Sequence, residues 1–122
     1  MNELNLKKCS KCGKVVNVMN CNDKNIMCCN ETMLDIKSNT EECAIEKHLP
    51  NYKIIDDKIL VQVNHVMEDE HYISFISLVK NDLEITKFLH SELKAEVEFP
   101  YLKGATLYAY CNKHGLWKCD VD

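Results

Sequence analysis

Four cysteines near the start of the chain have a spacing that suits one metal ion. Cys9 and Cys12 form a Cys-x-x-Cys knuckle, and the adjacent pair Cys28 and Cys29 follows after 15 residues. The turn of the knuckle aims two sulfurs at one point, and Gly13 directly after it permits the tight backbone that this turn needs. Four thiolates make a tetrahedral sulfur site, which suits zinc or iron.

The adjacent pair Cys28 and Cys29 distinguishes this pattern from a zinc ribbon, which carries two separate Cys-x-x-Cys knuckles. Neighbouring side chains on an extended chain point to opposite sides, so both sulfurs reach one ion only where the backbone bends. The spacing therefore predicts a bent segment at this pair, and it leaves open whether the ion is a functional iron or a structural zinc. Three further cysteines, Cys21, Cys43 and Cys119, are interpreted as reduced thiols outside the pattern.

A second set of candidate ligands, four histidines and one cysteine, lies in the later part of the chain. The five residues are His48, His65, His71, Cys111 and His114. Cys111 and His114 form a compact Cys-x-x-His turn, and His65 continues an apolar strand face, where an imidazole needs a partner. One thiolate does not make a closed structural zinc site of the four-sulfur kind. Five donors leave one octahedral position free, and an open position is typical of a catalytic metal.

Composition limits the kind of protein that carries these residues. Eight cysteines in 122 residues indicate either disulfides or metal sites, and the polar start of the chain lacks the apolar core of a signal peptide. We therefore expect a cytoplasmic protein with reduced, metal-binding thiols. No stretch reaches the roughly 20 apolar residues of a membrane helix. The net charge of −4 argues against a nucleic-acid-binding protein.

The elements that must position these ligands are predicted to be strands in two domains. A polar stretch around Ser38 separates the cysteine-rich residues 1–37 from residues 38–122, which hold every histidine. The first segment is too small to fold on hydrophobic burial alone, so it needs a staple such as a metal. In the second, residues 58–67 alternate, and residues 72–79 and 107–110 are rich in β-branched and aromatic side chains.

These patterns predict an all-β protein, in which a small metal-stapled β domain is followed by an immunoglobulin-like β-sandwich. Residues 81–94 are the best candidate for a helix, although their period is ambiguous and residues 85–88 fit a strand as well. If the strands around Glu68 form a hairpin centred there, His65 and His71 stand opposite each other. Directly opposed side chains are close enough to share a metal.

Two parts of the sequence resemble the desulfoferrodoxin family. The Cys-x2-Cys, 15-residue, Cys-Cys spacing resembles desulforedoxin and the N-terminal domain of desulfoferrodoxin, although Asn30 and Thr32 stand where glycine and proline are more usual. The segments Glu46-Lys47-His48, His71-Tyr72-Ile73 and Cys111–Trp117 resemble the superoxide reductase (neelaredoxin) domain. The resemblance spans nearly the whole chain in the family's order.

The resemblance implies two mononuclear iron sites and an enzymatic activity. One iron is held by four thiolates, those of Cys9, Cys12, Cys28 and Cys29. The other has four equatorial histidines and an axial cysteine, which correspond to His48, His65, His71, His114 and Cys111. The implied reaction is the one-electron reduction of superoxide to hydrogen peroxide. The implied partners are a rubredoxin-like electron donor and a second copy of the chain in a homodimer.

The resemblance also indicates catalytic roles for two residues beside His48. Lys47 is the candidate for attracting the anionic substrate and stabilising the product by charge and hydrogen bonding. Glu46 resembles the residue that occupies the sixth position in the oxidised resting state. Three other functions stay open: a non-enzymatic iron electron carrier with a structural second metal, a zinc-dependent interaction module, and superoxide dismutation. Binding of small anions at an open ferrous position distinguishes the enzyme from the carrier.

Overall fold

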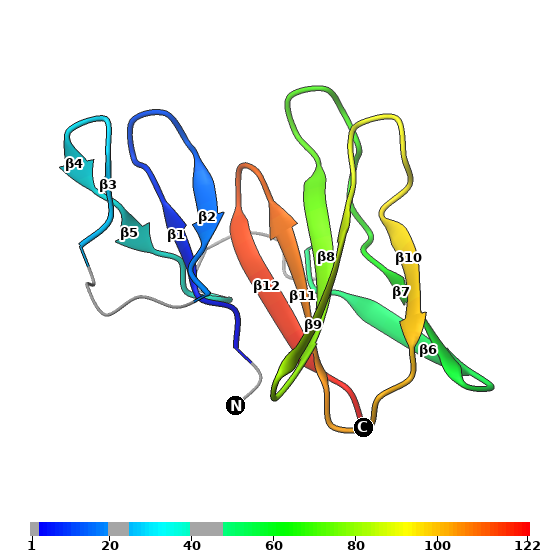
Figure 1. Cartoon of the computed structure of the whole chain (residues 1–122). Coiled ribbons are helices and arrows are strands. Elements are labelled where there is room, and N and C mark those ends of the chain that lie inside the picture. Colours follow the sequence, from blue (N-terminus) through cyan, green and yellow to red (C-terminus); the bar gives the residue numbers. More distant parts are fainter. Residues whose placement is uncertain (1–2, 20–24, 40–47) are drawn as a thin grey trace. The chain divides into compact units, whose positions relative to one another are not determined.

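The computed structural model describes residues 3–19, 25–39 and 48–122. The chain divides into two compact units, Leu4–Lys37 and Ser38–Asp122, the second of which also includes Met1–Glu3, and their strands are labelled in Figure 1. Both units are built from antiparallel strands, and the described residues form no helix. Within these residues there is accordingly no helix that could span a membrane. The all-β prediction is confirmed.

The small unit contains short strands and little apolar core. Its strands are β1 (Leu6–Lys8), β2 (Val15–Asn17), β3 (Met27–Cys28), β4 (Glu31–Thr32) and β5 (Leu34–Asp35). One sheet has the order β2-β1-β5, and β3 pairs with β4 in a separate ribbon. Among the described residues of this unit, the buried hydrophobic side chains are those of Leu6, Cys9 and Met33. So small a core offsets little of the entropy lost on folding.

The large unit is a sandwich of two antiparallel sheets. Its strands are β6 (Asn51–Ile55), β7 (Lys58–Gln62), β8 (Ile73–Lys80), β9 (Leu83–Phe88), β10 (Glu96–Pro100), β11 (Thr106–Cys111) and β12 (Gly115–Asp120). One sheet has the order β10-β7-β6, and the other has the order β12-β11-β8-β9. Sheets of three and four strands make up an immunoglobulin-like sandwich, as the sequence predicts.

The core of the sandwich lies between its two sheets. Ile59 and Val61 of β7, Ile76 and Leu78 of β8, and Leu107 of β11 are fully buried. They recur at every second position, which is the period of a strand with one face in the core. Burying each such side chain contributes about 1.5–3 kcal/mol. This core gives the loops at the strand ends a stable frame.

Two segments differ from the sequence prediction. The alternating run at residues 58–67 is a strand only to Gln62. Beyond it, the amide of His65 donates to the carbonyl of Val63 (2.9 Å) in a three-residue turn that bends the chain out of the sheet. Residues 81–94 do not form the candidate helix, because pairing of β9 with β8 makes Leu83–Phe88 a strand.

Candidate metal centres

The knuckle at Cys9 and Cys12 closes through hydrogen bonds of its own backbone. The amide of Gly13 donates to the carbonyl of Cys9 (3.0 Å), and the amide of Cys9 donates to the carbonyl of Lys14 (2.9 Å). Gly13 has a φ of 79°, which glycine adopts without strain. The amide of Cys12 also points at the sulfur of Cys9 (3.5 Å). The knuckle therefore stabilises negative charge on that sulfur.

The adjacent pair Cys28 and Cys29 bends, as its spacing predicts. Cys28 pairs with Glu31 across a two-residue hairpin loop of Cys29 and Asn30. These two loop residues have φ values of 52° and 61°, and positive φ at both positions is typical of a type I′ turn. The turn leaves the two sulfurs 3.9 Å apart. Asparagine tolerates this left-handed conformation, which costs most other residues about 1–2 kcal/mol.

The sulfurs of Cys9, Cys12, Cys28 and Cys29 form a group that we call the cysteine site. All of them lie within 4.8 Å of one another. The sulfurs of Cys12 and Cys28 are 3.7 Å apart, and those of Cys28 and Cys29 are 3.9 Å apart. A tetrahedron with metal–sulfur bonds of about 2.3 Å places its sulfurs about 3.8 Å apart. The cysteine site therefore has the dimensions of one tetrahedral ion.

The thiols of the cysteine site differ widely in acidity. Backbone hydrogen bonds, chiefly from the amide of Cys12, lower the pKa of Cys9 to about 6. Hydrogen bonding with the Cys12 side chain is the main cause that raises the pKa of Cys29 to about 12, and it also raises the pKa of Cys28. Four thiolates so close together repel one another, and a bound cation removes this repulsion. The residues present thus fit a metal ion.

The second group, which we call the histidine site, joins three stretches of the large unit. His48 precedes β6, His65 and His71 lie between β7 and β8, and Cys111 and His114 lie at the turn from β11 to β12. The imidazoles contact edge to face in the closed order His48, His65, His71, His114, with neighbouring ring centres 4.6–4.9 Å apart. Four neighbouring rings in this order form a square of nitrogen donors.

Distances within the histidine site match an octahedral ion. Nδ1 of His114 lies 3.1 Å from Nε2 of His48 and 3.2 Å from Nε2 of His71. Neighbouring nitrogens around an octahedral ion with bonds of about 2.1 Å are about 3.0 Å apart. Sγ of Cys111, which is buried, lies 3.3 Å from Nε2 of His65 and 3.7 Å from Nδ1 of His114. Cys111 is thus a fifth donor beside the square.

Burial keeps two of the imidazoles in the form that binds metals. Loss of solvation is the main cause that lowers the pKa of His65 and His71, and the neighbouring histidines lower both further by charge repulsion. The ammonium group of Lys113 also lowers the pKa of His71. Neutral imidazole is the form that coordinates a metal ion.

A β-bulge aims Cys111 into the histidine site. Tyr110 of β11 pairs with Phe75 of β8, whereas the next residue, Cys111, pairs with Ile73. Ser74 is therefore an extra residue in β8. A bulge of this kind bends its strand and redirects the side chains near it.

The loop after Cys111 depends on Gly115 and Trp117. Cys111 pairs with Gly115 across a three-residue loop that includes His114. Gly115 has a φ of 82°, the left-handed conformation with which such a loop ends. The indole nitrogen of Trp117 donates to the carbonyl of His114 (3.0 Å), and its ring stacks on His48 at 5.2 Å. One buried tryptophan thus contacts two members of the site.

Comparison with known proteins places the chain in a family. Residues 40–120 match the family described as desulfoferrodoxin. A desulfoferrodoxin from Desulfarculus baarsii is 38% identical over 96% of this chain and 96% of its own length. The chain belongs to the desulfoferrodoxin family. The resemblance drawn from the cysteine and histidine motifs is therefore confirmed.

Solved structures of superoxide reductases share the fold of this chain. The protein from Treponema pallidum has a TM-score of 0.73 at 24% identity, and the match covers 96% of this chain and 98% of that one. The protein from Giardia intestinalis has a TM-score of 0.56 at 24% identity, and the match covers 63% of this chain and 98% of that one. At this level of identity the likeness shows a common β-sandwich.

The structure brings together all of the residues that the sequence predicts as ligands. They form the two groups already described, Cys9, Cys12, Cys28 and Cys29, and His48, His65, His71, Cys111 and His114. The predicted catalytic residues Glu46 and Lys47 lie outside the described residues, as do Cys21 and Cys43. Cys119 is half-buried and belongs to neither group, and its thiol donates to the carbonyl of Pro50 (3.2 Å).

The predicted register of His65 and His71 is wrong. The turn consists of residues 69 and 70, and His71 pairs with Glu68 through hydrogen bonds of 2.9 and 3.2 Å. A hairpin centred on Glu68 does not form, because the chain leaves the sheet at Val63 and no longer alternates as a strand. The rings of His65 and His71 still meet, with centres 4.6 Å apart.

Sequence reasoning missed the residues that support the ligands of the histidine site. Asn112 and Trp117 hydrogen-bond to the backbone on either side of His71 and at His114. The positive charge of Lys113 lowers the pKa of His71. All three lie within the Cys111–Trp117 segment that carries the family resemblance. Their place in that segment is the sequence feature that could have pointed to a role at the site.

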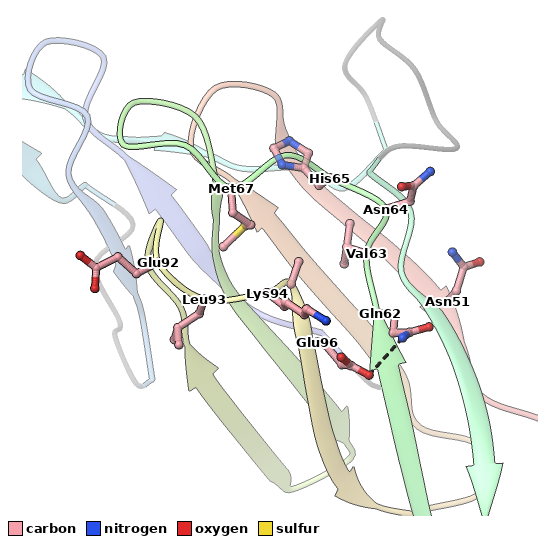
Figure 2. A pocket seen from close by; sticks show the side chains of 11 residues that line it. Asn51, Gln62, Val63, Asn64, His65, Met67, Glu92, Leu93, Lys94 and Glu96 are labelled. Atoms are coloured by element: carbon pink, nitrogen blue, oxygen red, sulfur yellow. Dashed lines mark hydrogen bonds between the residues drawn. The ribbon is translucent and has the colours of Figure 1, made fainter.

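A groove of about 570 Å³ adjoins the histidine site at His65. Figure 2 shows His65 and Met67 at one end, and Gln62 donating to Glu96 (3.0 Å) farther along. Lys94 lies among these side chains, so the lining carries both signs of charge. The other four donors of the histidine site do not line the groove. It is therefore a neighbouring feature and not the metal site itself.

Proposed function

We propose that this member of the desulfoferrodoxin family is a superoxide reductase, which converts superoxide, one electron and two protons to hydrogen peroxide. The observation that carries the proposal is the square of four imidazoles with a buried thiolate beside it. Five donors leave one octahedral position for a small ligand. The names and common fold of the superoxide reductases from Treponema pallidum and Giardia intestinalis support the same activity.

The histidine site would hold the iron at which the reaction takes place. Its ligands would be His48, His65, His71 and His114 in the square and Cys111 as the fifth donor. Imidazole and thiolate donors suit iron, and the bound iron would supply the electron that superoxide accepts. The cysteine site would hold a second iron, with Cys9, Cys12, Cys28 and Cys29 as ligands, and serve as an electron-transfer or accessory centre.

The protein's own residues would bind the anion and tune the site. The thiolate of Cys111 is fully buried, so it donates electron density without exposure to solvent. Lys47 would attract superoxide and stabilise the product, and Glu46 would occupy the sixth position in the oxidised resting state. Lys113 adds positive charge beside His71. Local cations are needed because the net charge of −4 opposes the approach of an anion.

The wider setting of the enzyme follows from the same proposal. Residues 1–37 would form the iron domain with the cysteine site, and residues 38–122 the catalytic domain. The electron donor would be rubredoxin or a similar small protein, and the working form a homodimer. Reduced cysteines at both sites suit a cytoplasmic enzyme that detoxifies superoxide.

Metal analysis with visible spectra is the first test of the proposal. We expect two irons per chain, with bands of a four-thiolate iron and a separate thiolate-to-iron band that Cys111→Ser removes. Zinc in both sites, or a single iron, would contradict the proposal. Azide should perturb the histidine-site band, whereas a pure electron carrier with a closed second site would not respond.

The products distinguish reduction from dismutation. A reductase yields one hydrogen peroxide per superoxide and consumes one electron from its donor. A dismutase yields one hydrogen peroxide per two superoxide ions, with the other released as dioxygen. A peroxide yield equal to the superoxide consumed, together with matching oxidation of the donor, is the expected result. Half that yield without donor oxidation would favour dismutation.

A further inference from the structure

Asn112 connects the two loops that meet at the histidine site. Its side-chain oxygen accepts a hydrogen bond from the amide of Tyr72 (2.9 Å), and its side-chain nitrogen donates to the carbonyl of Glu70 (3.0 Å). Its own amide donates to the carbonyl of Tyr72 (3.2 Å). Glu70 and Tyr72 flank His71, and Asn112 follows Cys111. One residue therefore holds both neighbours of one histidine against the strand end that supplies the thiolate.

The chemistry of these contacts selects a carboxamide of this length. The two side-chain contacts are to one N–H donor and one C=O acceptor, and a carboxamide offers the matching acceptor and donor in one planar group. Rotating the amide by half a turn would place its NH2 against the N–H of Tyr72 and its oxygen against the carbonyl of Glu70. Aspartate would keep the first contact and oppose the second, because both of its oxygens are acceptors.

The hydrogen bonds of Asn112 lie close to the point where His71 meets His114. Nε2 of His71 lies 3.2 Å from Nδ1 of His114. The hydrogen bonds between Glu68 and His71 set the shape of the turn, but they do not set its distance from the loop after β11. The sheet pairing of β11 with β8 ends at Cys111 and Ile73, and the three hydrogen bonds of Asn112 extend the connection from there to the residues on both sides of His71.

We infer that Asn112 is a positioning residue, which holds His71 within reach of the ion that Cys111 and His114 bind. The inference rests on the proposed function for the identity of that ion, whereas the hydrogen bonds belong to the chain itself. Residues that support a metal ligand in this way usually change metal affinity by about 10- to 100-fold when they are replaced. Asn112 therefore contributes to retention of the metal without being a ligand.

Asn112→Ala tests the inference in the full, iron-loaded chain. We expect a chelator to remove iron from the histidine site about 10- to 100-fold more readily than in the wild type, as followed by the thiolate-to-iron band. The four-thiolate bands of the cysteine site should not change, so that site is an internal reference. Hydrogen–deuterium exchange at the amide of Tyr72 should become faster, because this amide loses its acceptor.

Two further variants separate positioning from general destabilisation. Asn112→Asp keeps the acceptor for Tyr72, so it should restore slow exchange of that amide and recover part of the iron retention. Asn64→Ala replaces an exposed asparagine beside His65 and should match the wild type in both measurements.

Two results would overturn the inference: an Asn112→Ala protein that retains iron and protects Tyr72 like the wild type, or one that loses iron equally from both sites. A wild-type chain that takes up no metal at the histidine site would instead contradict the proposed function. The exchange of Tyr72 would then still decide whether Asn112 holds the loop.

Discussion

Single side chains behind the ligands define the shape of the histidine site. Trp117 stacks on His48 and hydrogen-bonds to the carbonyl of His114, so one rigid, buried ring orients two ligands from separate parts of the chain. Asn112 acts in the same way on the residues around His71. A metal ligand needs such a partner because a free imidazole has several rotamers, of which one points at the ion.

Replacement of Lys47 tests the local attraction of superoxide. Lys47→Ala removes the positive charge of the residue that directly precedes His48 in the sequence, so we expect capture of the anion to slow by about threefold to tenfold and to depend less on salt. Pulse radiolysis at several ionic strengths measures both effects. Lys53→Ala, which removes the same charge from an exposed position in β6, is the control. Equal capture rates in the two variants would mean that Lys47 has no special role.

The identity of the ligands could be predicted from the sequence, whereas their supports could not. The spacing of Cys9 and Cys12, and of Cys111 and His114, is local, and it restricts the chemistry without knowledge of the fold. The contacts of Asn112 span about 40 residues of sequence. They depend on the bulge in β8 and on the turn at residues 69 and 70, neither of which has a distinctive local pattern.

At the scale of elements, the hairpin between β3 and β4 determines how two adjacent cysteines face one ion. Its loop residues, Cys29 and Asn30, both have positive φ. A type I′ turn of this kind twists in the same sense as the strands that it joins. Adjacent side chains on an extended strand point to opposite sides. The turn changes these directions, so that the sulfurs of both cysteines can face one ion.

Substitutions at Asn30 test the importance of this turn. Asn30→Val places a β-branched residue in the left-handed region, which costs about 1–2 kcal/mol, so the cysteine site should release iron about tenfold more readily. Asn30→Gly adopts the same conformation without strain and should retain iron like the wild type. Chelator competition, followed by the four-thiolate bands, measures the difference. Identical release from the two variants would show that the turn does not limit metal binding.

Strand prediction succeeded where one face of a strand is buried. It failed where pairing with an adjacent strand, or a turn at the strand's end, determines the structure. The alternation of Ile59 and Val61 in β7 correctly indicated a strand, but its end depends on the turn at Val63–His65. Strand β9 lies at the edge of its sheet, and most of its side chains are at least partly exposed. Its sequence therefore lacks a clear period, and pairing with β8 determines its structure.

At the scale of the whole molecule, the two units differ in what stabilises them. The large unit has a continuous apolar core contributed by both sheets. In the described part of the small unit, by contrast, the buried hydrophobic residues are Leu6, Cys9 and Met33, and Cys9 belongs to the cysteine site. A unit of this size without a larger core needs a metal to fold. Loss of metal should therefore lower the free energy of unfolding of the small unit much more than that of the large unit.

Removal of metal from the cysteine site should unfold the small unit alone. In Cys9→Ser, or after chelation, the amides of β1 should lose protection from hydrogen–deuterium exchange, because metal binding and folding are coupled in such units. The amides of β8 and β11 should stay protected by the sandwich core. Cys111→Ser is the matched control, since it removes a thiolate from the other site and should leave β1 protected. Loss of protection in both units of Cys9→Ser would show that they fold as one, and full protection of β1 would show that the small unit folds without its ion.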